Sequence, residues 1–532
     1  MNVIICLASA LASAAVARYY LHMLQLESYQ LDGYVRWLGK NHDKHLGGTL
    51  TIGVGATVAY YALWLLLRMF ISDQASRITA GVVTLVGFLA AAFLLDRRLH
   101  SQPEKKPLAY TPRMKRLYAC LCLIALALAF ILSALGIPAY ILFVGVPYLA
   151  LAAGGAMTPV EKAINNYYLN DAKAKLDARP DLIKIGITGS YGKTSTKFIL
   201  AAILSEKYDV LATPASFNTP MGLTRVIREK LEPHHQVFIA EMGARHAGDI
   251  KELVDLVHPS MGLITSVGPQ HLETFGNIET VANTKFELIE GLPRDGLAFF
   301  ASDGGEVDKL YERAGVKKFL TGTRGMRLDM KAEDIAVGRG GSRFTLKDGA
   351  TGEKIECETK LLGRHNIGNI ALACCAARQL GLTLEEIARG VRKIEPVEHR
   401  LQLMPGANGV TVIDDAFNSN PVGAKAALDV LAAFEGRHVI VTPGMVEQGA
   451  QEKEINRQFG AQMAGRCDEI ILVGRRRTQP IAEGLRAEGV AAERIHVVGS
   501  LDEATGVLGR IGKPGDVVLF ENDLPDNYNE DQ

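Results

Sequence analysis

Residues 188–195 read Thr-Gly-Ser-Tyr-Gly-Lys-Thr-Ser and lie between two apolar runs, 182–187 and 198–204. This arrangement predicts a strand, a glycine turn and a helix. Glycines let backbone N–H groups approach phosphate oxygens, while Lys193 adds a positive charge and Thr194 offers a hydroxyl to Mg²⁺. An ordinary strand-to-helix turn is the alternative. The Gly-Lys-Thr-Ser sequence at the start of a helix favours a phosphate-binding loop instead.

The spacing of the glycines narrows the type of loop. The common pattern G-x-x-x-x-G-K would need glycine at position 187, where this chain has Ile187, and Gly186 lies one residue too early. The spacing therefore favours families that use the shorter form T-G-[ST]-x-G-K-[ST].

The composition sets limits on the class of protein. A length of 532 residues suggests three or four domains. The 58 basic residues equal the 58 acidic ones, so there is no overall charge that would attract nucleic acid. The seven cysteines include no C-x-x-C pair, which indicates reduced thiols rather than a zinc ribbon or a disulfide framework.

Residues 1–155 differ in kind from the rest and predict an all-helical transmembrane region. Four spans are the alternative to five, because the first apolar run is short and could be a signal peptide, although it lacks a positively charged start. The apolar runs of roughly membrane-spanning length are Val3–Ala17, Leu50–Leu67, Ile78–Leu95, Leu117–Leu135 and Ile137–Gly155.

Lysine and arginine gather in the connections after the first and third predicted spans. Placing both in the cytoplasm puts the N-terminus outside and everything after Gly155 inside, where ATP is available. The sequence thus predicts a multi-pass protein of the cell membrane, in contact with lipid, whose catalytic domains are cytoplasmic. A transporter is disfavoured, because Arg68 lies at the margin of a span and predicted spans two to five are otherwise bare of charge.

The remaining chain predicts two α/β domains. Apolar strand patterns alternate with helical ones, which is typical of a parallel sheet covered on both faces. Residues 317–362 change to short alternating runs and predict an antiparallel insertion or edge. The predicted parts are a transmembrane region (1–155), a polar helical connector (156–181), a central P-loop domain (182–394) and a Rossmann-like C-terminal domain (395–532).

Polar residues follow several predicted strands, where ligands bind in open α/β sheets. Glu241 comes directly after an apolar strand and is placed like a carboxylate near Mg²⁺. His271 follows the next strand and is either a metal ligand or a loop histidine. Lys285, taken alone, is most often a surface lysine.

A series of motifs resembles the ATP-dependent Mur ligase family, and within it most closely the MurF type, which adds D-Ala-D-Ala to the muropeptide precursor. The resemblance covers about 350 residues, from Leu182 onward. In order, the motifs are T-G-S-Y-G-K-T-S (188–195), S-F-N-T-P-M-G-L-T (216–224), E-M-G-A-R-H-A-G-D-I (241–250), H-L-E-T-F-G (271–276), T-K-F-E (284–287), L-L-G-R-H-N-I-G-N (361–369), P-V-E-H-R-L (396–401), D-D-A-F-N-S-N-P (414–421) and T-P-G-M-V-E-Q-G (442–449).

The resemblance implies two Mg²⁺ sites and an ATP site. Thr194 and Glu241 would hold one Mg²⁺, and His271 the second, with help from a carbamate formed on Lys285. Asn218 and Thr219 would face the substrate. The residues implied to bind ATP are Gly189, Ser190, Gly192, Lys193, Thr194, Ser195, Asn366, Arg400 and Asp415, the last two from the C-terminal domain.

The family's reaction joins a carboxylate to an amine. The γ-phosphoryl group of ATP passes to the carboxylate, and the amine then attacks the acyl phosphate and expels phosphate. The resemblance therefore implies partners of two kinds, a carboxylate-bearing peptide or muropeptide and an amine acceptor, in cell-wall or related envelope synthesis.

Three departures concern the parts of the family that face the substrates. The soluble N-terminal domain that grips the UDP-linked muropeptide is replaced by the membrane segment. The Asn-x-Asp nucleotide motif is replaced by Ala301-Ser302-Asp303. The basic, glycine-containing loop after the last strand is replaced by the acidic run 521–526, which suggests a different amine, one with more positive character.

The hypothesis from sequence is a membrane-embedded Mur-type amide ligase whose carboxylate substrate is presented at the bilayer. Plain MurF activity with a membrane anchor is the nearest alternative. A non-catalytic, nucleotide-binding membrane scaffold is another, but it would predict loss of Lys193, Glu241, His271 or Lys285, and all four are present.

Overall fold

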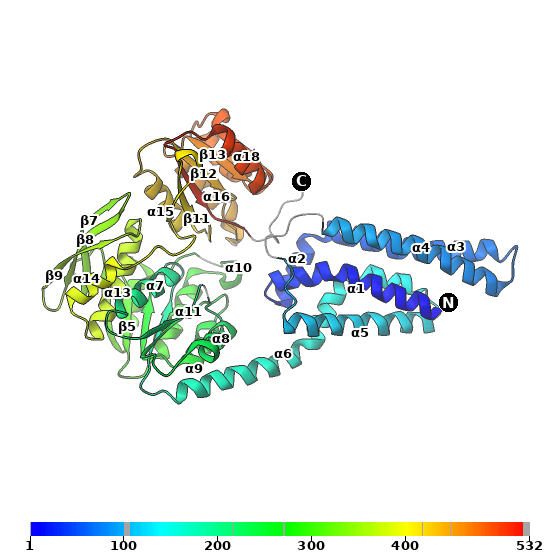
Figure 1. Cartoon of the computed structure of the whole chain (residues 1–532), viewed down its shortest axis with the longest axis horizontal. Helices are drawn as coiled ribbons and strands as arrows, with labels where there is room; N and C mark the ends of the chain where they lie inside the picture. The colour runs from blue at the N-terminus through cyan, green and yellow to red at the C-terminus, as the bar shows by residue number, and fades with distance from the viewer. Residues whose placement is uncertain are drawn as a thin grey trace. The chain divides into compact units, whose positions relative to one another are not determined.

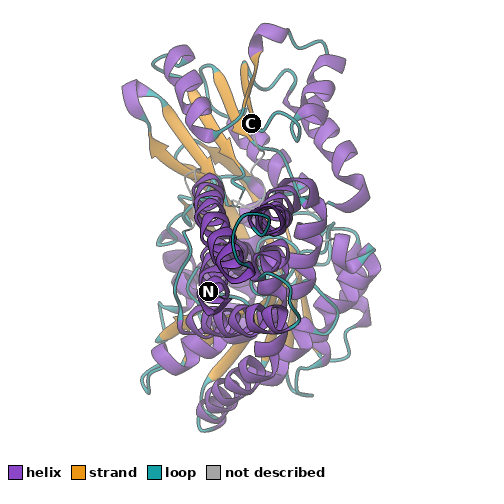
Figure 2. Ribbon diagram, turned by 90° about the vertical axis from the view of Figure 1, so that its right-hand side faces the viewer, coloured by secondary structure: helices purple, strands orange, loops and turns teal. Residues whose placement is uncertain are grey.

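The computed structural model describes residues 2–100, 107–215, 217–269, 272–417, 419–446 and 448–524, without the side chains of 42–46, 272–273 and 450. The chain, coloured from blue to red in Figure 1, divides into two compact units. The first extends to Asn166 and the second from Tyr167 to Leu524. The described strands, orange in Figure 2, all lie in the second unit.

The described part of the first unit is helical throughout. Helix α1 packs against α4 and α5, and α3 packs against α4 and the short 3₁₀ helix η1. Tyr20, Tyr140 and Phe143 are completely buried between these helices. The elements are α1 (Asn2–Leu26), α2 (Leu31–Lys40), α3 (His42–Leu67), α4 (Asp73–Leu99), α5 (Pro112–Ala134), η1 (Ala139–Gly145) and α6 (Val146–Asp177).

Five helical segments in the described residues are long and apolar enough to cross a membrane, as the sequence predicts. Large apolar side chains such as Leu11, Val86 and Leu123 are exposed on their outer surfaces. A lipid environment suits such surfaces, whereas water does not. The segments are Asn2–Leu26, Gly47–Leu67, Asp73–Leu99, Pro112–Ala134 and Ala139–Asp177.

The fifth segment is longer than its apolar run. The connector predicted over 156–181 is not a separate element, because α6 continues without a break from Val146 to Asp177 and contains Pro159. The helix changes from apolar to charged along its length, since the residues after Met157 are polar but still form a helix readily. The boundary between the two units falls within this helix, after Asn166.

The first part of the second unit is a nine-stranded sheet in the order β2-β3-β1-β4-β5-β6-β7-β8-β9. Strands β1 to β6 are mutually parallel, and β7, β8 and β9 form an antiparallel extension. The strands are β1 (Ile183–Thr188), β2 (Val210–Ala212), β3 (Val237–Glu241), β4 (Met261–Ile264), β5 (Leu297–Ala301), β6 (Lys317–Gly322), β7 (Met330–Gly338), β8 (Gly341–Asp348) and β9 (Lys354–Thr359).

The prediction of an antiparallel segment from residue 317 is wrong for its first strand. Strand β6 pairs in parallel with β5 over its whole register, because the short helix α12 (Glu306–Arg313) provides the crossover between them. Strand β7 still pairs in parallel with the end of β6, and antiparallel pairing begins between β7 and β8.

Helices cover both faces of this sheet, as predicted. In β3, Val237 and Ile239 belong to one core, while Phe238 and Ala240 belong to the other, which explains why the strand is apolar throughout. One face carries α7 (Lys193–Leu204), α13 (Arg364–Gln379) and α14 (Leu384–Arg392). The other carries α8 (Pro220–Lys230), α9 (Asp249–Val257), α11 (Ile278–Glu290), α12 and the end of α6, with α10 (Leu272–Phe275) close to α11.

The second part of this unit is a six-stranded sheet in the order β10-β11-β15-β12-β13-β14. Strand β10 pairs antiparallel with β11 and was not predicted; it is a short edge strand that ends in Pro405. The elements are β10 (Gln402–Pro405), η2 (Ala407–Gly409), β11 (Thr411–Asp415), α15 (Pro421–Leu431), β12 (His438–Thr442), η3 (Gly449–Gln451), α16 (Glu452–Met463), β13 (Glu469–Val473), α17 (Gln479–Ala487), η4 (Ala492–Arg494), β14 (Ile495–Val498), α18 (Leu501–Ile511) and β15 (Val517–Glu521).

Glycines allow α16 and α17 to pack closely. A Cβ atom added at Gly484 would lie 2.0 Å from the carbonyl oxygen of Arg457, and one at Gly460 would lie 2.1 Å from that of Ile481. We expect Gly484→Ala to push the helices apart and lower the stability of the unit by about 1–3 kcal/mol. Thermal unfolding of the full chain in detergent measures the effect.

Gly506→Ala is the matched control, because Gly506 is also helical but has no atom within 4 Å of the added Cβ. Alanine has a higher helix propensity than glycine, so this variant should be neutral or more stable by up to about 1 kcal/mol. Equal melting temperatures for the two variants would contradict close glycine packing of α16 and α17.

Candidate active site

The loop between β1 and α7 has a backbone that only glycine fits at two positions. Gly189 has φ of 151° and Gly192 has φ of 80°. A Cβ at Gly189 would lie 2.0 Å from Oγ1 of Thr265, and one at Gly192 would lie 2.8 Å from Oδ1 of Asn369. The loop leads directly into the first turn of α7, whose free N–H groups favour anions. Thr194 and Ser195 lie in this turn.

Side chains of the loop tie it to the segment that follows β4. The buried Ser190 hydroxyl donates to the carbonyl of Gly268 and accepts from the N–H of the same residue, both at 3.0 Å. The Tyr191 hydroxyl donates to the carbonyl of Pro269 at 2.8 Å. The predicted phosphate-binding residue Ser190 therefore holds the loop in shape through its side chain.

Lys193 lies across this loop. Its ammonium donates to the carbonyl oxygens of Gly189 (2.6 Å) and Ser190 (3.1 Å). Burial lowers the pKa of Lys193 to about 8, although the Glu241 carboxylate acts in the opposite direction. A cation with few water contacts, beside a helix N-terminus, is suited to binding phosphate.

Glu241 ends β3 and is the centre of a buried hydrogen-bond cluster. Its Oε2 accepts from the Thr194 hydroxyl and from the Lys197 ammonium, both at 3.0 Å, and its Oε1 accepts from the Asn218 amide at 3.0 Å. Glu241 is 1% exposed and Lys197 is not exposed at all. The structure thus brings the predicted metal ligands Thr194 and Glu241 together.

Lys197 is a residue of this site that the sequence interpretation missed. Its ammonium also donates to the carbonyl of Ala215. The available signal was its position one turn after Thr194 and directly before the apolar run 198–204, because a charge buried there must find a partner.

Asn218 and Thr219, predicted to face the substrate, have local partners here. The Asn218 amide contacts Glu241, and the Thr219 hydroxyl accepts from the N–H of Gly222 at the start of α8. Thr219 is thus the N-cap of that helix. These contacts are internal to the protein, so the role of Asn218 and Thr219 toward the substrate stays a prediction.

Lys285 is buried in α11, with 2% exposure, and its ammonium lies 5.7 Å from the centre of the Phe275 ring. Burial, together with the nearby charge of Lys193, lowers the pKa of Lys285 to about 7. Lys285 therefore lies in the interior, and the surface position suggested by its residue type alone is wrong. His271, predicted to bind the second metal, lies outside the described residues.

Asn366 is linked to the phosphate loop through the side chain of Asn369. In α13 the Asn366 side chain donates to the carbonyl of Leu362 (2.9 Å) and accepts from the Asn369 amide (3.4 Å). Asn369 in turn lies against Gly192. Asn366, which the resemblance implies to bind ATP, and the phosphate loop are therefore linked by one buried asparagine, Asn369, that the sequence analysis did not single out.

Arg400 and Asp415 interact in the C-terminal part of the unit. Burial raises the pKa of Asp415 to about 6, and the Arg400 guanidinium opposes this shift. The Arg400 guanidinium also lies 4.4 Å from the centre of the Phe417 ring. The flanking residues His399 and Leu401 have φ of 58° and 48°, so the backbone around Arg400 is strained.

The acidic run after β15 begins inside the protein. Glu521 is 1% exposed and accepts hydrogen bonds from the hydroxyls of Ser419 and Thr442. It lies beside Asp415, its register partner in β11. Asn522 has φ of 66° and donates to the carbonyl of Gly444 at 2.6 Å.

The oxygen ligands available at the loop fit a magnesium ion. Among the residues that the structure describes, no group of three or more His, Cys, Asp or Glu side chains could hold a metal. Mg²⁺, however, commonly takes only one or two protein oxygens, with water and substrate phosphates supplying the others. The hydroxyl of Thr194 and the carboxylate of Glu241, with 3.0 Å between their oxygens, meet that requirement.

A glycine loop at a helix N-terminus, a lysine across it and a carboxylate at the end of the adjacent strand define a P-loop nucleotide-binding protein. Two sequence families match this chain, the Mur ligase middle domain over residues 187–377 and the Mur ligase, glutamate ligase domain over residues 399–521. The chain belongs to the Mur ligase family. It is an ATP-dependent amide ligase of the MurF-like type, a class that acts in peptidoglycan precursor synthesis.

Two curated relatives are UDP-N-acetylmuramoyl-tripeptide–D-alanyl-D-alanine ligases. That of Bacillus subtilis is 30% identical over 340 residues, which cover 63% of this chain and 72% of the relative. That of Escherichia coli is 33% identical over 293 residues, which cover 55% of this chain and 64% of the relative.

Solved MurF structures share the fold. MurF from Acinetobacter baumannii superposes with a TM-score of 0.62 at 24% identity. The superposition covers 68% of this chain and 78% of the Acinetobacter baumannii chain. The MurF ligase from Thermotoga maritima in complex with ADP superposes with a TM-score of 0.60 at 25% identity, over 68% of this chain and 80% of its own.

Lys197→Met tests the buried cluster around Glu241. Removing the ammonium leaves the buried Glu241 carboxylate without the cation that donates a hydrogen bond to it, so we expect its position to change. ATP-dependent phosphate release by the full chain should fall at least tenfold, and more Mg²⁺ should be needed for half-maximal rate.

Lys251→Met is the control, because Lys251 is exposed on α9 and pairs with Asp255 at the surface. This variant should retain the parent rate. If Lys197→Met also kept the parent rate and magnesium requirement, Lys197 would not hold Glu241 in its working position.

The pKa of Glu521 predicts a pH dependence of stability. Burial raises it from 4.5 to about 7, and the Ser419 and Thr442 hydrogen bonds oppose the shift. Between these values the folded chain keeps a proton that the unfolded chain has lost, so stability falls as pH rises from about 4.5 to about 7. Glu521→Gln removes this titrating group. As the pH rises from 5 to 8, the parent should therefore lose roughly 3 kcal/mol of stability relative to the variant.

Melting temperatures of the full chain at pH 5 and pH 8 provide the measurement. Glu488→Gln changes an exposed glutamate of the same domain and should follow the parent at both values. If Glu521→Gln followed the parent as well, the Glu521 carboxyl would not be buried as described.

Proposed function

We propose that this chain is a membrane-embedded Mur ligase that joins a carboxylate presented at the bilayer to an amine. The observation that carries the proposal is the combination, in one chain, of five apolar helical segments and a Mur ligase region. The family match begins at residue 187, and the helical unit, which ends at Asn166, lies before it. The part of the chain that precedes the ligase region is therefore suited to lipid.

The site residues have roles that follow from their chemistry. Gly189, Gly192 and Lys193 would bind the phosphates of ATP, and Thr194 and Glu241 would hold Mg²⁺. Bound there, Mg²⁺ would offset negative charge on the phosphoryl group during transfer. Lys197 would hold Glu241 in place, because its ammonium lies 3.0 Å from the carboxylate.

The reaction has two steps. The substrate carboxylate takes the γ-phosphoryl group, which gives an acyl phosphate and ADP. The amine attacks the acyl carbon, loses a proton and expels inorganic phosphate, which leaves the amide. Arg400 would add positive charge near the phosphates, and its charge already affects the pKa of Lys193.

A carbamate on Lys285 would complete a second metal site with His271. Support comes from the pKa of about 7 at Lys285, since a neutral amine is the form that adds CO₂. Incubation of the full chain with ¹³C-labelled bicarbonate should give a carbamate carbon resonance that Lys285→Ala lacks. The same spectrum from both chains would refute the carbamate.

We place the ligase region in the cytoplasm and the N-terminus outside. Arg116, at the start of α5, donates to both oxygens of Glu161 at 2.8 and 2.9 Å, and Glu161 belongs to α6. The basic end of the helical unit is thus the end from which α6 continues into the ligase region. Positively charged connections remain in the cytoplasm.

The carboxylate substrate is expected to be lipid-linked. We would incubate the full chain in detergent with ATP, Mg²⁺, UDP-linked or lipid-linked muropeptides and a panel of amines that includes D-Ala-D-Ala, and identify products by mass. Amide formation on a lipid-linked carboxylate is the expected result. Lys193→Ala should lower it at least 100-fold, whereas Lys230→Ala, at the exposed end of α8, should not.

Other outcomes distinguish the alternatives. Amidation of the UDP-linked tripeptide by D-Ala-D-Ala, with no preference for lipid-linked substrates, would show MurF activity with a membrane anchor and overturn the proposed substrate. Absence of phosphate release with every acceptor would indicate a non-catalytic scaffold. Activity that survived in Lys193→Ala would refute the proposed ATP site.

A further inference from the structure

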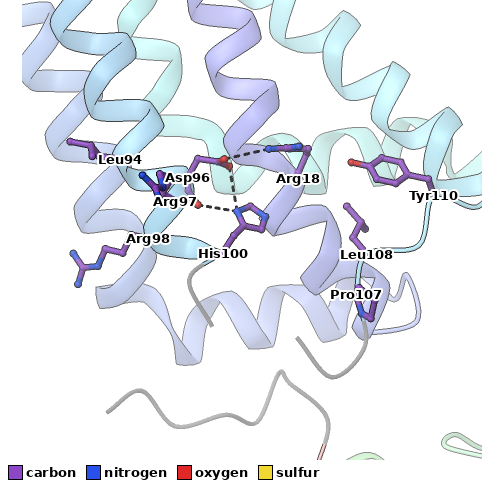
Figure 3. Close-up of a pocket in the computed structure, with 9 residues that line it drawn as sticks. All are labelled: Arg18, Leu94, Asp96, Arg97, Arg98, His100, Pro107, Leu108 and Tyr110. Carbon is purple, nitrogen blue, oxygen red and sulfur yellow. Dashed lines mark hydrogen bonds and ion pairs between the residues drawn. The ribbon is translucent and has the colours of Figure 1, made fainter. Parts of the chain in front are cut away.

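Histidine–aspartate pairs differ in what they join in the two units. In the helical unit, the ring of His100 lies 3.4 Å from Asp96, one turn earlier in α4, and Figure 3 shows Arg18 of α1 pointing toward the same carboxylate. In the second unit, Nδ1 of His399 lies 2.7 Å from Oδ2 of Asp414, 15 positions later in the chain. The first cluster joins α1 to the end of α4. The second joins the turn before β10 to β11, in the part of the chain that is predicted to reach the nucleotide.

The turn 399–401 has a strained backbone on both sides of Arg400. His399 has φ of 58° and Leu401 has φ of 48°, in the left-handed region that residues other than glycine seldom adopt. Such conformations persist where the surrounding contacts enforce them, and they are frequent at functional sites. The contacts that hold this turn therefore determine where the Arg400 side chain begins.

Asp414 holds the first strained residue through its side chain. One of its carboxylate oxygens bonds with the ring of His399, and the other accepts from the N–H of Ala416 at 3.0 Å. Asp414 is also 7% exposed. A buried carboxylate with both oxygens engaged has little freedom to turn, so it fixes the His399 ring against β11.

Asp415, the next residue of β11, holds the other strained residue through its backbone. Its Oδ1 accepts from the N–H of Leu401 at 3.2 Å, and Leu401 is buried in the core of the C-terminal domain. The pairing of β10 with β11 begins directly afterwards, where Gln402 lies opposite Asp414. The turn is therefore held on each side of Arg400.

The charge of Arg400 acts on the predicted nucleotide site. Burial lowers the pKa of Arg400, and the carboxylates of Asp415 and Glu241 oppose this shift. The charge of Arg400 in turn lowers the pKa of Lys193. Arg400 thus interacts with the lysine that lies across the phosphate loop and with the carboxylate predicted to hold Mg²⁺. The lysine of such a loop reaches the β- and γ-phosphates, so Arg400 is placed near the end of ATP that reacts.

We propose that His399 and Asp414 are positioning residues for the ligase reaction, and that their contact holds the Arg400 guanidinium where it contacts the γ-phosphoryl group of ATP. A planar guanidinium binds phosphate through two aligned hydrogen bonds, so its orientation matters as much as its charge. The inference rests on the proposed role of Arg400, whereas the strained turn and the contacts that hold it do not.

His399→Gly separates the contact from the strain. Glycine adopts φ of 58° freely, so the backbone can keep its path while the link to Asp414 is lost. His399→Asn is the conservative variant, because asparagine tolerates the left-handed region and its amide can donate to the same carboxylate.

His258→Gly is the matched control. His258 ends α9 with φ of 48°, so it is the same residue type in the same kind of conformation. It precedes β4, which runs parallel to β1, whereas the phosphate loop follows β1. The control therefore changes the opposite edge of the sheet.

Nucleotide binding to the full chain in detergent provides a measurement that needs no acceptor substrate. The probes are ADP and a non-hydrolysable ATP analogue, each with Mg²⁺. His399→Gly should weaken binding of the analogue at least about fivefold and binding of ADP less than about twofold, because only the analogue carries a γ-phosphoryl group. Asp414→Ala should behave in the same way. His258→Gly should bind both nucleotides like the parent, and His399→Asn should keep most of the affinity for the analogue.

Arg400→Ala shows whether the pair acts through Arg400. When Arg400 is already alanine, His399→Gly should have no further effect on the analogue, because residues that act through one another are not additive. An equal loss with and without Arg400 would overturn the proposal, since His399 would then act independently. Equal weakening of ADP and the analogue would overturn it as well, because the γ-phosphoryl group would not be involved.

Melting temperatures identify variants that fail to fold, and Asp414→Ala and His399→Gly each provide the test if the other is unstable. Unchanged analogue binding by a folded His399→Gly chain, with a selective loss in Arg400→Ala, would refute the positioning role alone. No selective loss in Arg400→Ala would refute the proposed contact of Arg400 with the phosphates. Failure of the ligase assay with every acceptor would refute the proposed function and leave the binding result standing.

Discussion

The buried ion pair between Lys197 and Glu241 organises the catalytic part of this protein. It joins α7, β3 and the segment before α8, because the same carboxylate also accepts from Thr194 and Asn218. A buried charge that loses its partner typically costs about 3–5 kcal/mol. The phosphate loop, the predicted metal ligands and the segment expected to face the substrate therefore share one electrostatic centre, and none of them can move far without disturbing the others.

Local patterns made much of the fold predictable. The loop at 188–195, the parallel strands and the five apolar segments each have their signal within a short run of residues. The partners of Glu241 do not, since Lys197 lies 44 positions away and Asn218 lies 23 away, and only the folded sheet brings them together. Strand β10 is too short to give a clear alternation, and the continuity of α6 is hidden by its change in composition.

The acidic run after β15 shows how sequence and structure inform each other. The sequence shows that acidic residues replace a basic loop, but the register of β15 decides where they point. Because Glu521 lies beside Asp415 and accepts from two hydroxyls, its carboxyl is part of the interior of the domain. The expectation that this run contacts a cationic amine therefore depends on residues beyond Glu521.

The contact between Asn369 and Gly192 has a consequence for the thermodynamics of nucleotide binding. Asn366, Asn369 and the phosphate loop form one packed body, and Ser190 and Tyr191 tie the same loop to the segment after β4. A loop already held in its final shape loses little conformational entropy when a ligand arrives. The free energy of phosphate binding is then not consumed in ordering the loop.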